Sequence, residues 1–338
     1  MTHVELDSIA NAMTPVGKGI LAADESSGTI AKRFAAIGLE STEEARRSYR
    51  ELLFTTPGLG EFISGVILFD ESIRQHTSGG IPFVEALTQQ GILPGIKVDR
   101  GVKGLPGFPG ETVTEGLDGL QQRLADYRGL GARFAKWRAV IHVGPGVPTP
   151  FAVEANAHAL ARYAALCQEA DLVPIVEPEV LMDGDHSLGR CEEVTGQVLR
   201  SVFDQLVAHR VRLEAMILKP NMVIPGTSCP QRASAADVAA ATVRCFRRHV
   251  PVAVPGIAFL SGGQSEIEAT EHLSVLNETT DLPWQLSFSF GRALQHSTLD
   301  TWGGKAENVR AAQGRLHERA RLNGLARKGV YQTALEAS

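Results

Sequence analysis

Residues 173–180 read VPIVEPEV, and residues 134–140 read FAKWRAV. Each is a short apolar run with charged residues at alternate positions, and a longer segment of helical pattern follows it. Six further runs begin near Gly19, Ser64, Leu93, Glu214, Val254 and Trp284. Successive runs start about 30 to 45 residues apart, which is the size of one strand-plus-helix unit. Eight such units predict an α/β fold, a single closed parallel (β/α)8 TIM barrel.

The segments between these runs carry helical signals. Residues 149–168 are rich in alanine and place apolar residues three to four positions apart, as an amphipathic helix does. Residues 234–249 open with SAAD, a pattern typical of a helix N-cap. The alternative fold, an open doubly wound sheet, is disfavoured because no GxGxxG follows the first run. We therefore expect one domain over residues 1–338, with a barrel core at about 17–314 and a C-terminal tail at about 315–338.

The composition is that of an ordinary globular protein, with 43% hydrophobic and 21% charged residues. The net charge of −5 disfavours a broad nucleic-acid surface. No run approaches the ~18 consecutive apolar residues of a membrane span, and the N-terminus lacks a targeting pattern, so we expect a cytoplasmic protein. The four cysteines are widely spread without a CxxC pair, which predicts reduced thiols. Because neither HxH nor HExxH occurs, the sequence predicts no metal site.

Charged residues lie inside or directly after several of the apolar runs, where a barrel carries its active site. Lys136 and Arg138 are two residues apart, as are Glu177 and Glu179, so each pair faces one side of its strand. Any one of them could reach solvent from a strand end. A whole set across neighbouring strands persists only if its charges compensate one another or serve a function. The other members of this set are Asp24, Lys97, Asp99 and Lys219.

Lys219 is the strongest candidate for a nucleophile. It follows the apolar residues MIL and precedes a proline, so its stem rises from apolar surroundings in an extended segment. Burial and a nearby cation such as Lys136 both favour the neutral amine, which attacks a carbonyl carbon. Glu177 or Glu179 could then transfer protons as a carbinolamine loses water to form an iminium. The alternative is a structural Lys–Glu pair that closes the barrel.

The last two runs end in patterns typical of phosphate-binding loops. Residues 259–266 read FLSGGQSE, and residues 287–294 read SFSFGRAL before a helix. Glycines let backbone N–H groups approach a phosphate, a helix N-terminus adds partial positive charge, and Arg292 adds a charge-assisted contact. Candidates for a second phosphate follow the first run: Ser26, Ser27, Thr29, Arg33, and Arg46 with Arg47. The last two could equally lie on an exposed helix face.

Together these stretches resemble one family, the class I (Schiff-base-forming) fructose-bisphosphate aldolases. The matching motifs run in order from about Gly17 to Gly314: GKGILAADESSGTIAKR, GVILFDES, GIKVDRG, FAKWRAV, VPIVEPEVLMDGDH, LKPNMV, FLSGGQSE and SFSFGRALQ. The resemblance implies a barrel that cleaves fructose 1,6-bisphosphate reversibly into dihydroxyacetone phosphate and glyceraldehyde 3-phosphate, in glycolysis or gluconeogenesis. It also implies a covalent Schiff base with no metal or other cofactor, sugar phosphates as small-molecule partners, and a homotetramer.

The resemblance implies a role for each residue of the charged set. Lys219, in LKPNM, matches the family's Schiff-base lysine, which attacks the ketone carbon of the substrate. Glu177 matches the principal proton shuttle, and Glu179 its supporting neighbour. Lys136 and Arg138 match the cations that hold this carboxylate network and contact substrate.

Other matches concern bond cleavage, phosphate binding and the tail. Asp24 matches the acid that orients the amine and helps to break the carbon–carbon bond, so the division of proton transfer between Asp24 and Glu177 stays open. One phosphate site is matched by Ser261, Gly262, Gly263, Ser289, Gly291 and Arg292. Residues matched near either phosphate are Ser26, Thr29, Lys97 and Arg33. The family's animal enzymes end in a tyrosine that assists proton transfer, whereas this chain ends at Ser338 with Tyr331 as its last tyrosine. The group that protonates the enamine is therefore not predicted.

Two other functions are weaker alternatives. A transaldolase-like Schiff-base barrel that acts on a single phosphate is disfavoured because basic and hydroxyl groups occur at both ends of the expected pocket. A phosphosugar-binding or scaffold protein without activity requires a lost catalytic group, whereas Lys219, Glu177 and Asp24 are all present.

Overall fold

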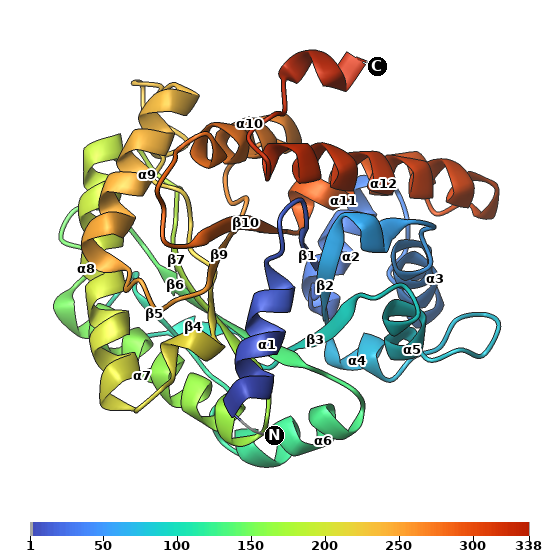
Figure 1. The fold of residues 1–338 in the computed structure, drawn as a ribbon, viewed down its shortest axis with the longest axis horizontal. Coiled ribbons are helices and arrows are strands. Elements are labelled where there is room, and N and C mark those ends of the chain that lie inside the picture. The colour runs from blue at the N-terminus through green and yellow to red at the C-terminus, as the bar shows by residue number, and fades with distance from the viewer. Residues whose placement is uncertain (1–2, 338) are drawn as a thin grey trace.

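The computed structural model describes residues 3–337; Met1, Thr2 and Ser338, which the predicted domain includes, lie outside the described residues. Eight parallel strands close into a barrel surrounded by helices (Figure 1). The strands pair in the order β1, β10, β9, β8, β7, β6, β3, β2 and back to β1. They are β1 (Gly19–Ala22), β2 (Ile63–Leu68), β3 (Leu93–Lys97), β6 (Phe134–Ile141), β7 (Val173–Val180), β8 (Ile217–Leu218), β9 (Gly256–Phe259) and β10 (Gln285–Phe290). The predicted (β/α)8 barrel is confirmed, and each strand begins within three residues of its predicted run.

Helices connect the strands and cover the outside of the barrel. They are α2 (Ser27–Ala36), α3 (Glu43–Phe54), α4 (Asp70–Ile73), α5 (Phe83–Thr88), α6 (Leu120–Gly129), α7 (Pro150–Glu169), α8 (Leu188–Ala208), α9 (Ala235–His249), α10 (Glu266–Asn277), α11 (Arg292–Trp302) and α12 (Val309–Ala326). Short 3₁₀ helices occupy Leu59–Glu61, Leu213–Ala215, Ala306–Asn308 and Thr333–Ala337. The two helices that the sequence predicted are α7 and α9. Ser234 forms a capping box at the start of α9, in which its Oγ accepts from Asp237 N at 3.2 Å.

The helix α1 (His3–Met13) closes the amino-terminal end of the barrel. Its buried residues Leu6, Ala10 and Met13 pack with Phe134 and Ile217, which are the first residues of β6 and β8. The sequence analysis did not predict this helix. Because this end is filled by apolar side chains, charged groups in the interior collect at the opposite end, where the strands finish.

Aromatic rings fill the barrel, and small residues make room for them. A Cβ on Gly95 of β3 would lie 2.1 Å from the Phe134 ring, so only glycine fits there. On the outer face of β6, Trp137 alternates with Lys136 and Arg138, is fully buried and packs on Tyr163 of α7 with ring centroids 5.6 Å apart. A hairpin of β4 (Val102–Gly104) and β5 (Thr112–Thr114), which the sequence did not predict, follows β3.

Candidate active site

A cavity of about 600 Å³ lies at the carboxyl ends of the barrel strands. Charged residues from β3, β6 and β7 line it, together with residues that follow β1, β8, β9 and β10. Another hollow of about 690 Å³ lies outside the barrel between α8 and α9, where its arginines Arg244 and Arg248 are 48% and 66% exposed. The barrel cavity is the stronger candidate because its charged side chains are buried, and burial of charge is expensive without a function.

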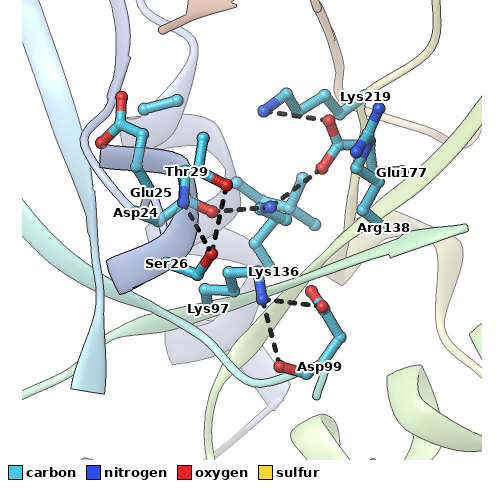
Figure 2. A network of polar contacts seen from close by, with 12 residues as sticks. Asp24, Glu25, Ser26, Thr29, Lys97, Asp99, Lys136, Arg138, Glu177 and Lys219 are labelled. Atoms are coloured by element: carbon cyan, nitrogen blue, oxygen red, sulfur yellow. Dashed lines mark hydrogen bonds and ion pairs between the residues drawn. The ribbon is translucent and has the colours of Figure 1, made fainter. Parts of the chain in front are cut away.

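Four buried side chains form one continuous network in the cavity (Figure 2). Lys136 Nζ lies 2.6 Å from Asp24 Oδ2 and 3.3 Å from Glu177 Oε2. Lys219 Nζ lies 3.2 Å from Glu177 Oε1. The Glu177 carboxylate therefore bridges two lysines, one of which also holds Asp24.

The strand geometry explains why these side chains meet. In the parallel pairing of β6 with β7, Lys136 lies opposite Ile175 and Arg138 opposite Glu177. Residues two apart share a face, so both cations and both glutamates of these strands line the cavity, as the alternation predicted. Lys219 extends β8 by one residue, because its backbone N–H donates to Val176 O at 2.8 Å.

The electrostatics favour the ionised forms of Asp24, Glu177 and Lys136. Burial would raise the pKa of Asp24, but the charges of Lys136, Lys219 and Lys97 outweigh it and lower the pKa to about 2. Burial acts on Glu177 in the same way, and the neighbouring cations, led by Lys136, hold its pKa below the usual value. Burial would lower the pKa of Lys136, but Asp24 and Glu177 raise it well above the usual range. The charges therefore compensate one another inside the barrel.

Arg138 and Glu179 form a second ion pair at the cavity wall. Arg138 is 39% exposed and faces the opening, whereas Glu179 is buried beneath it. A Cβ on Gly262 would lie 3.0 Å from Glu179 Oε1, so the loop after β9 approaches this carboxylate closely. Glu179 thus contacts both the guanidinium and the loop.

The loops after β9 and β10 form one end of the cavity. Ser261, Gly262, Ser289, Gly291 and Arg292 all line it. Gly291 is the N-cap of α11 and Arg292 its first residue, so the positive end of the helix dipole faces the cavity. The Ser289 hydroxyl is buried and has no hydrogen-bond partner among residues 3–337.

Gly263 is not among the described residues that line this cavity, although the sequence placed it there. The backbone at Gly263 has a φ of +74°, in the left-handed region that favours glycine. A Cβ at this position would lie 2.3 Å from Met182 Cγ. Gly263 can therefore affect a ligand only indirectly, through the shape of the loop that carries Ser261 and Gly262.

The opposite end of the cavity is formed by the start of α2 and the end of β3. Ser26 is the N-cap of α2, and its hydroxyl lies 3.1 Å from that of Thr29. Lys97 Nζ lies 2.8 Å from Asp99 Oδ1. Arg33 also lines the cavity, where it forms an ion pair with Glu25. Three of the predicted phosphate residues, Ser26, Thr29 and Lys97, are thus brought together here.

Three of the predicted phosphate residues, Ser27, Arg46 and Arg47, are not among the described residues that line the cavity. Arg46 lies on α3. Its guanidinium binds the Glu71 carboxylate through two bonds of 2.8 and 2.6 Å, and it also donates to Ser41 O at 2.8 Å. The Arg46 side chain therefore connects α3 to α4. This outcome is close to the alternative prediction that Arg46 lies on the surface of a helix. Arg46 is corrected to a structural residue.

Sequence reasoning missed several residues of the cavity wall. Glu25 lines it, and the segment after β3 contributes Gly101 and Val102, whereas Asp99, which the sequence placed in the charged set, lines it as expected. The available signal for Glu25 was its charge, three residues after the end of β1 and next to the candidate Asp24. Tyr331 lies elsewhere: its hydroxyl donates to Glu336 at 2.6 Å, and its carbonyl accepts from Ser274 of α10.

Other sequence expectations concern thiols, metals and membranes. The four cysteines are free and buried, in agreement with the predicted reduced thiols. Within residues 3–337 no three histidine, cysteine, aspartate or glutamate side chains are grouped so that they could hold a metal ion. None of the helices described is both long enough and apolar enough to span a bilayer.

Known proteins resemble this chain along nearly its whole length. The family model "Glycolytic: Fructose-bisphosphate aldolase class-I" matches residues 5–338. A probable fructose-bisphosphate aldolase class 1 of Xylella fastidiosa is 55% identical over 333 residues, which cover 98% of this chain and 100% of that protein. The cytosolic fructose-bisphosphate aldolase 6 of Arabidopsis thaliana is 55% identical over 328 residues, covering 96% and 91%.

A solved structure gives the same answer for the fold. The fructose-bisphosphate aldolase from Plasmodium falciparum, determined in complex with TRAP and a small molecule inhibitor, has a TM-score of 0.96 and 51% identity. The match covers 97% of this chain and 95% of that one. These relatives confirm the predicted aldolase activity, that of a glycolytic carbon–carbon lyase. The chain belongs to the class I fructose-bisphosphate aldolase family.

Proposed function

We propose that Lys219 is the nucleophile with which this chain cleaves fructose 1,6-bisphosphate into dihydroxyacetone phosphate and glyceraldehyde 3-phosphate. The position of Lys219 carries the proposal: its amine is buried in the barrel cavity, 3.2 Å from the Glu177 carboxylate. A carboxylate at this distance can exchange protons with the amine and with a group bonded to it.

Covalent bond formation begins with attack of the Lys219 amine on the C2 ketone. The nitrogen lone pair forms the C–N bond, the carbonyl oxygen takes a proton, and the amine loses one. Glu177 carries these protons and then protonates the carbinolamine hydroxyl, which leaves as water. The product is an iminium that withdraws electrons from the neighbouring carbon.

Cleavage then removes the proton of the C4 hydroxyl. As the C4–O bond becomes a carbonyl, the C3–C4 bond breaks and its electrons pass into the iminium, which becomes an enamine. We assign this proton to Glu177, whose carboxylate lies 3.2 Å from Lys219 Nζ, whereas the Asp24 carboxylate is bound to Lys136 at 2.6 Å. Asp24 instead holds Lys136, whose charge stabilises negative charge that develops on oxygen. Protonation of the enamine at C3 and hydrolysis release the second product.

Each end of the cavity binds one of the two phosphates of the substrate. The 1-phosphate is attached next to the ketone carbon, so it binds close to Lys219. The strand β9 pairs directly with β8, and β10 pairs with β9, so the loop of Ser261 and the loop of Arg292 are the nearest anion sites. Ser26, Thr29 and Lys97 then receive the 6-phosphate. Fixing both phosphates converts binding energy into orientation of the ketone toward the amine.

The remaining assignments follow from the family and from the charge of the cavity. We propose that the reaction uses no metal or other cofactor, because the iminium on Lys219 supplies the electron sink. We also propose a homotetramer in the cytoplasm whose partners are sugar phosphates, and neither nucleic acid nor membrane. The domain extends over the whole chain, with the barrel core at about residues 17–314 and the tail after it.

Trapping of the covalent intermediate tests the proposal. Borohydride added with dihydroxyacetone phosphate should reduce the iminium and leave a mass adduct on the peptide that contains Lys219. EDTA should leave the activity unchanged. An enzyme that EDTA inactivates, and that borohydride does not modify at Lys219, contradicts the proposed chemistry.

The transaldolase-like alternative is tested by substrate preference. Cations and hydroxyls line both ends of the cavity, so the bisphosphate should be cleaved with a higher kcat/KM than fructose 1-phosphate. Equal values for the two substrates would favour a site for a single phosphate. A Lys219→Met protein that keeps its cellular role would favour the scaffold alternative.

A further inference from the structure

The Glu25 carboxylate is a buried acid that the proposed chemistry does not use. Glu25 directly follows Asp24, but its side chain points away from Lys136 (Figure 2). It is 6% exposed and binds Arg33, Arg50 at 2.6 Å and Gln295 Nε2 at 3.0 Å. Burial would raise its pKa, but Arg50 and Arg33 lower the pKa below the usual value, so the group is ionised.

The two arginines on this carboxylate lie in different surroundings. The Arg50 side chain is 3% exposed and is not among the described residues that line the cavity. The Arg33 side chain is 27% exposed and does line it. One carboxylate balances only one of the two guanidinium charges, so a positive charge remains for an anion that enters from the cavity. Arg33 is the arginine that such an anion can reach.

Arg33 lies against the loop that begins α11. A Cβ on Gly291 would be 3.9 Å from Arg33 Nη2. Ser289 at the end of β10 and Arg292 at the start of α11 flank Gly291, and we have assigned this segment to the 1-phosphate. The sequence could not assign Arg33 to either phosphate, whereas this contact places it at the end nearest Lys219.

Gln295 connects this network to the same loop from the other side. It lies one turn into α11, and its Nε2 donates to Glu25 and, at 2.7 Å, to Ala22 O at the end of β1. Its Oε1 accepts from Tyr49 of α3 at 3.1 Å. The network therefore fixes the end of β1, the side chain of Arg33 and the start of α11 relative to one another.

We propose that Glu25 is a positioning residue for the 1-phosphate. It holds the Arg33 guanidinium beside Gly291 and, through Gln295, sets the first turn of α11, so that both meet the same anion. Glu25 does not touch the substrate. The inference rests on the proposed function, in particular on the assignment of residues 289–292, between β10 and α11, to the 1-phosphate.

Steady-state kinetics of Glu25→Gln test this role. The amide cannot hold two arginines as a carboxylate does, so KM should rise about tenfold for fructose 1,6-bisphosphate and by a similar factor for fructose 1-phosphate, with kcat within about twofold of the unsubstituted enzyme. Borohydride should still trap dihydroxyacetone phosphate on Lys219 at saturating concentration. The matched control is Glu71→Gln, which removes the carboxylate of the Arg46–Glu71 pair outside the cavity and should leave both KM values unchanged.

Each contrary outcome has a distinct meaning. If KM rises for the bisphosphate alone, Arg33 binds the 6-phosphate and not the 1-phosphate. If neither KM value changes, Glu25 has only a structural role. Either result overturns the proposal. If Glu25→Gln does not fold, Gln295→Leu removes only the connecting amide and should raise both KM values by a smaller factor. Unchanged KM values in that variant also overturn the proposal. An unsubstituted enzyme that borohydride cannot trap would instead contradict the proposed function itself.

Discussion

Lys136 Nζ lies 2.6 Å from Asp24 Oδ2, although β6 and β1 are not neighbours in the barrel. The strands β2 and β3 lie between them, so this ion pair crosses the interior. The contact fixes Lys136 where it also reaches Glu177 at 3.3 Å. A contact between residues 24 and 136 thus sets the position of the carboxylate that faces Lys219.

The Asp24–Lys136 pair should make stability depend on pH in the acid range. The pKa of Asp24 is lowered from 3.8 to about 2 in the folded protein, so its contribution is complete above the unfolded value and is lost as pH falls toward about 2. The contribution is on the order of 2 kcal/mol. The free energy of unfolding should therefore fall more steeply between about pH 5 and about pH 3 in the unsubstituted protein than in Asp24→Asn, as measured by urea denaturation. Parallel curves would contradict the lowered pKa.

Lys136→Met should leave Asp24 and Glu177 without the cation that both contact. Lys136 is the leading charge that lowers the pKa of Glu177, so its loss raises that pKa. We expect kcat to fall by about a hundredfold or more, and the acid limb of the pH–rate profile to move to higher pH. The control is Lys32→Met, because Lys32 is exposed on α2. An unchanged acid limb would show that Lys136 does not set the protonation of the carboxylate.

Glu177→Gln should slow the steps that move protons on and off Lys219. The amide keeps the shape of the carboxylate but cannot accept a proton, so we expect kcat to fall by about 10²- to 10⁴-fold. Rapid-quench borohydride trapping in a single turnover should show slower formation of the Lys219 adduct. Glu193→Gln is a suitable control, because Glu193 is 68% exposed and forms an ion pair with Arg190 on the outside of α8. Adduct formation at the normal rate would remove Glu177 from carbinolamine dehydration.

The positions of the central charges could be predicted because they lie in or directly beside strands. Lys136 and Arg138 share a face through the period of two, and Lys219 continues β8 through its bond to Val176 O. This alternation of side chains applies only within a strand and gives no orientation for residues beyond its end. Since β1 ends at Ala22, nothing in the sequence indicated that Glu25 would turn away from the network that Asp24 joins.

Other features depend on residues that only the fold brings together. Arg46 was a reasonable phosphate candidate until α4 placed Glu71 beside it. The helix α1 carries Leu6, Ala10 and Met13 on one face. Only the tertiary packing shows that this face fills the end of the barrel. The hairpin of β4 and β5 was missed because its strands are three residues long and lie among glycines and prolines.

Gly263→Ala should weaken binding of the 1-phosphate although Gly263 does not line the cavity. Its φ of +74° costs an alanine about 1 kcal/mol, and the added Cβ would lie 2.3 Å from Met182 Cγ. The loop must then shift, and Ser261 and Gly262 move with it. We expect KM for fructose 1-phosphate to rise several-fold, with little change in kcat.

A second substitution separates the two causes of this effect. Met182→Ala in the same protein removes the side chain that the new methyl group would contact, but it leaves the backbone strain at residue 263 in place. The double variant should therefore recover part of the KM loss, whereas Met182→Ala alone gives the baseline for the cavity that it creates. Recovery shows that Met182 supports the loop from behind. If the double variant has a KM for fructose 1-phosphate as high as that of Gly263→Ala, the backbone conformation at residue 263 alone determines the position of the loop after β9.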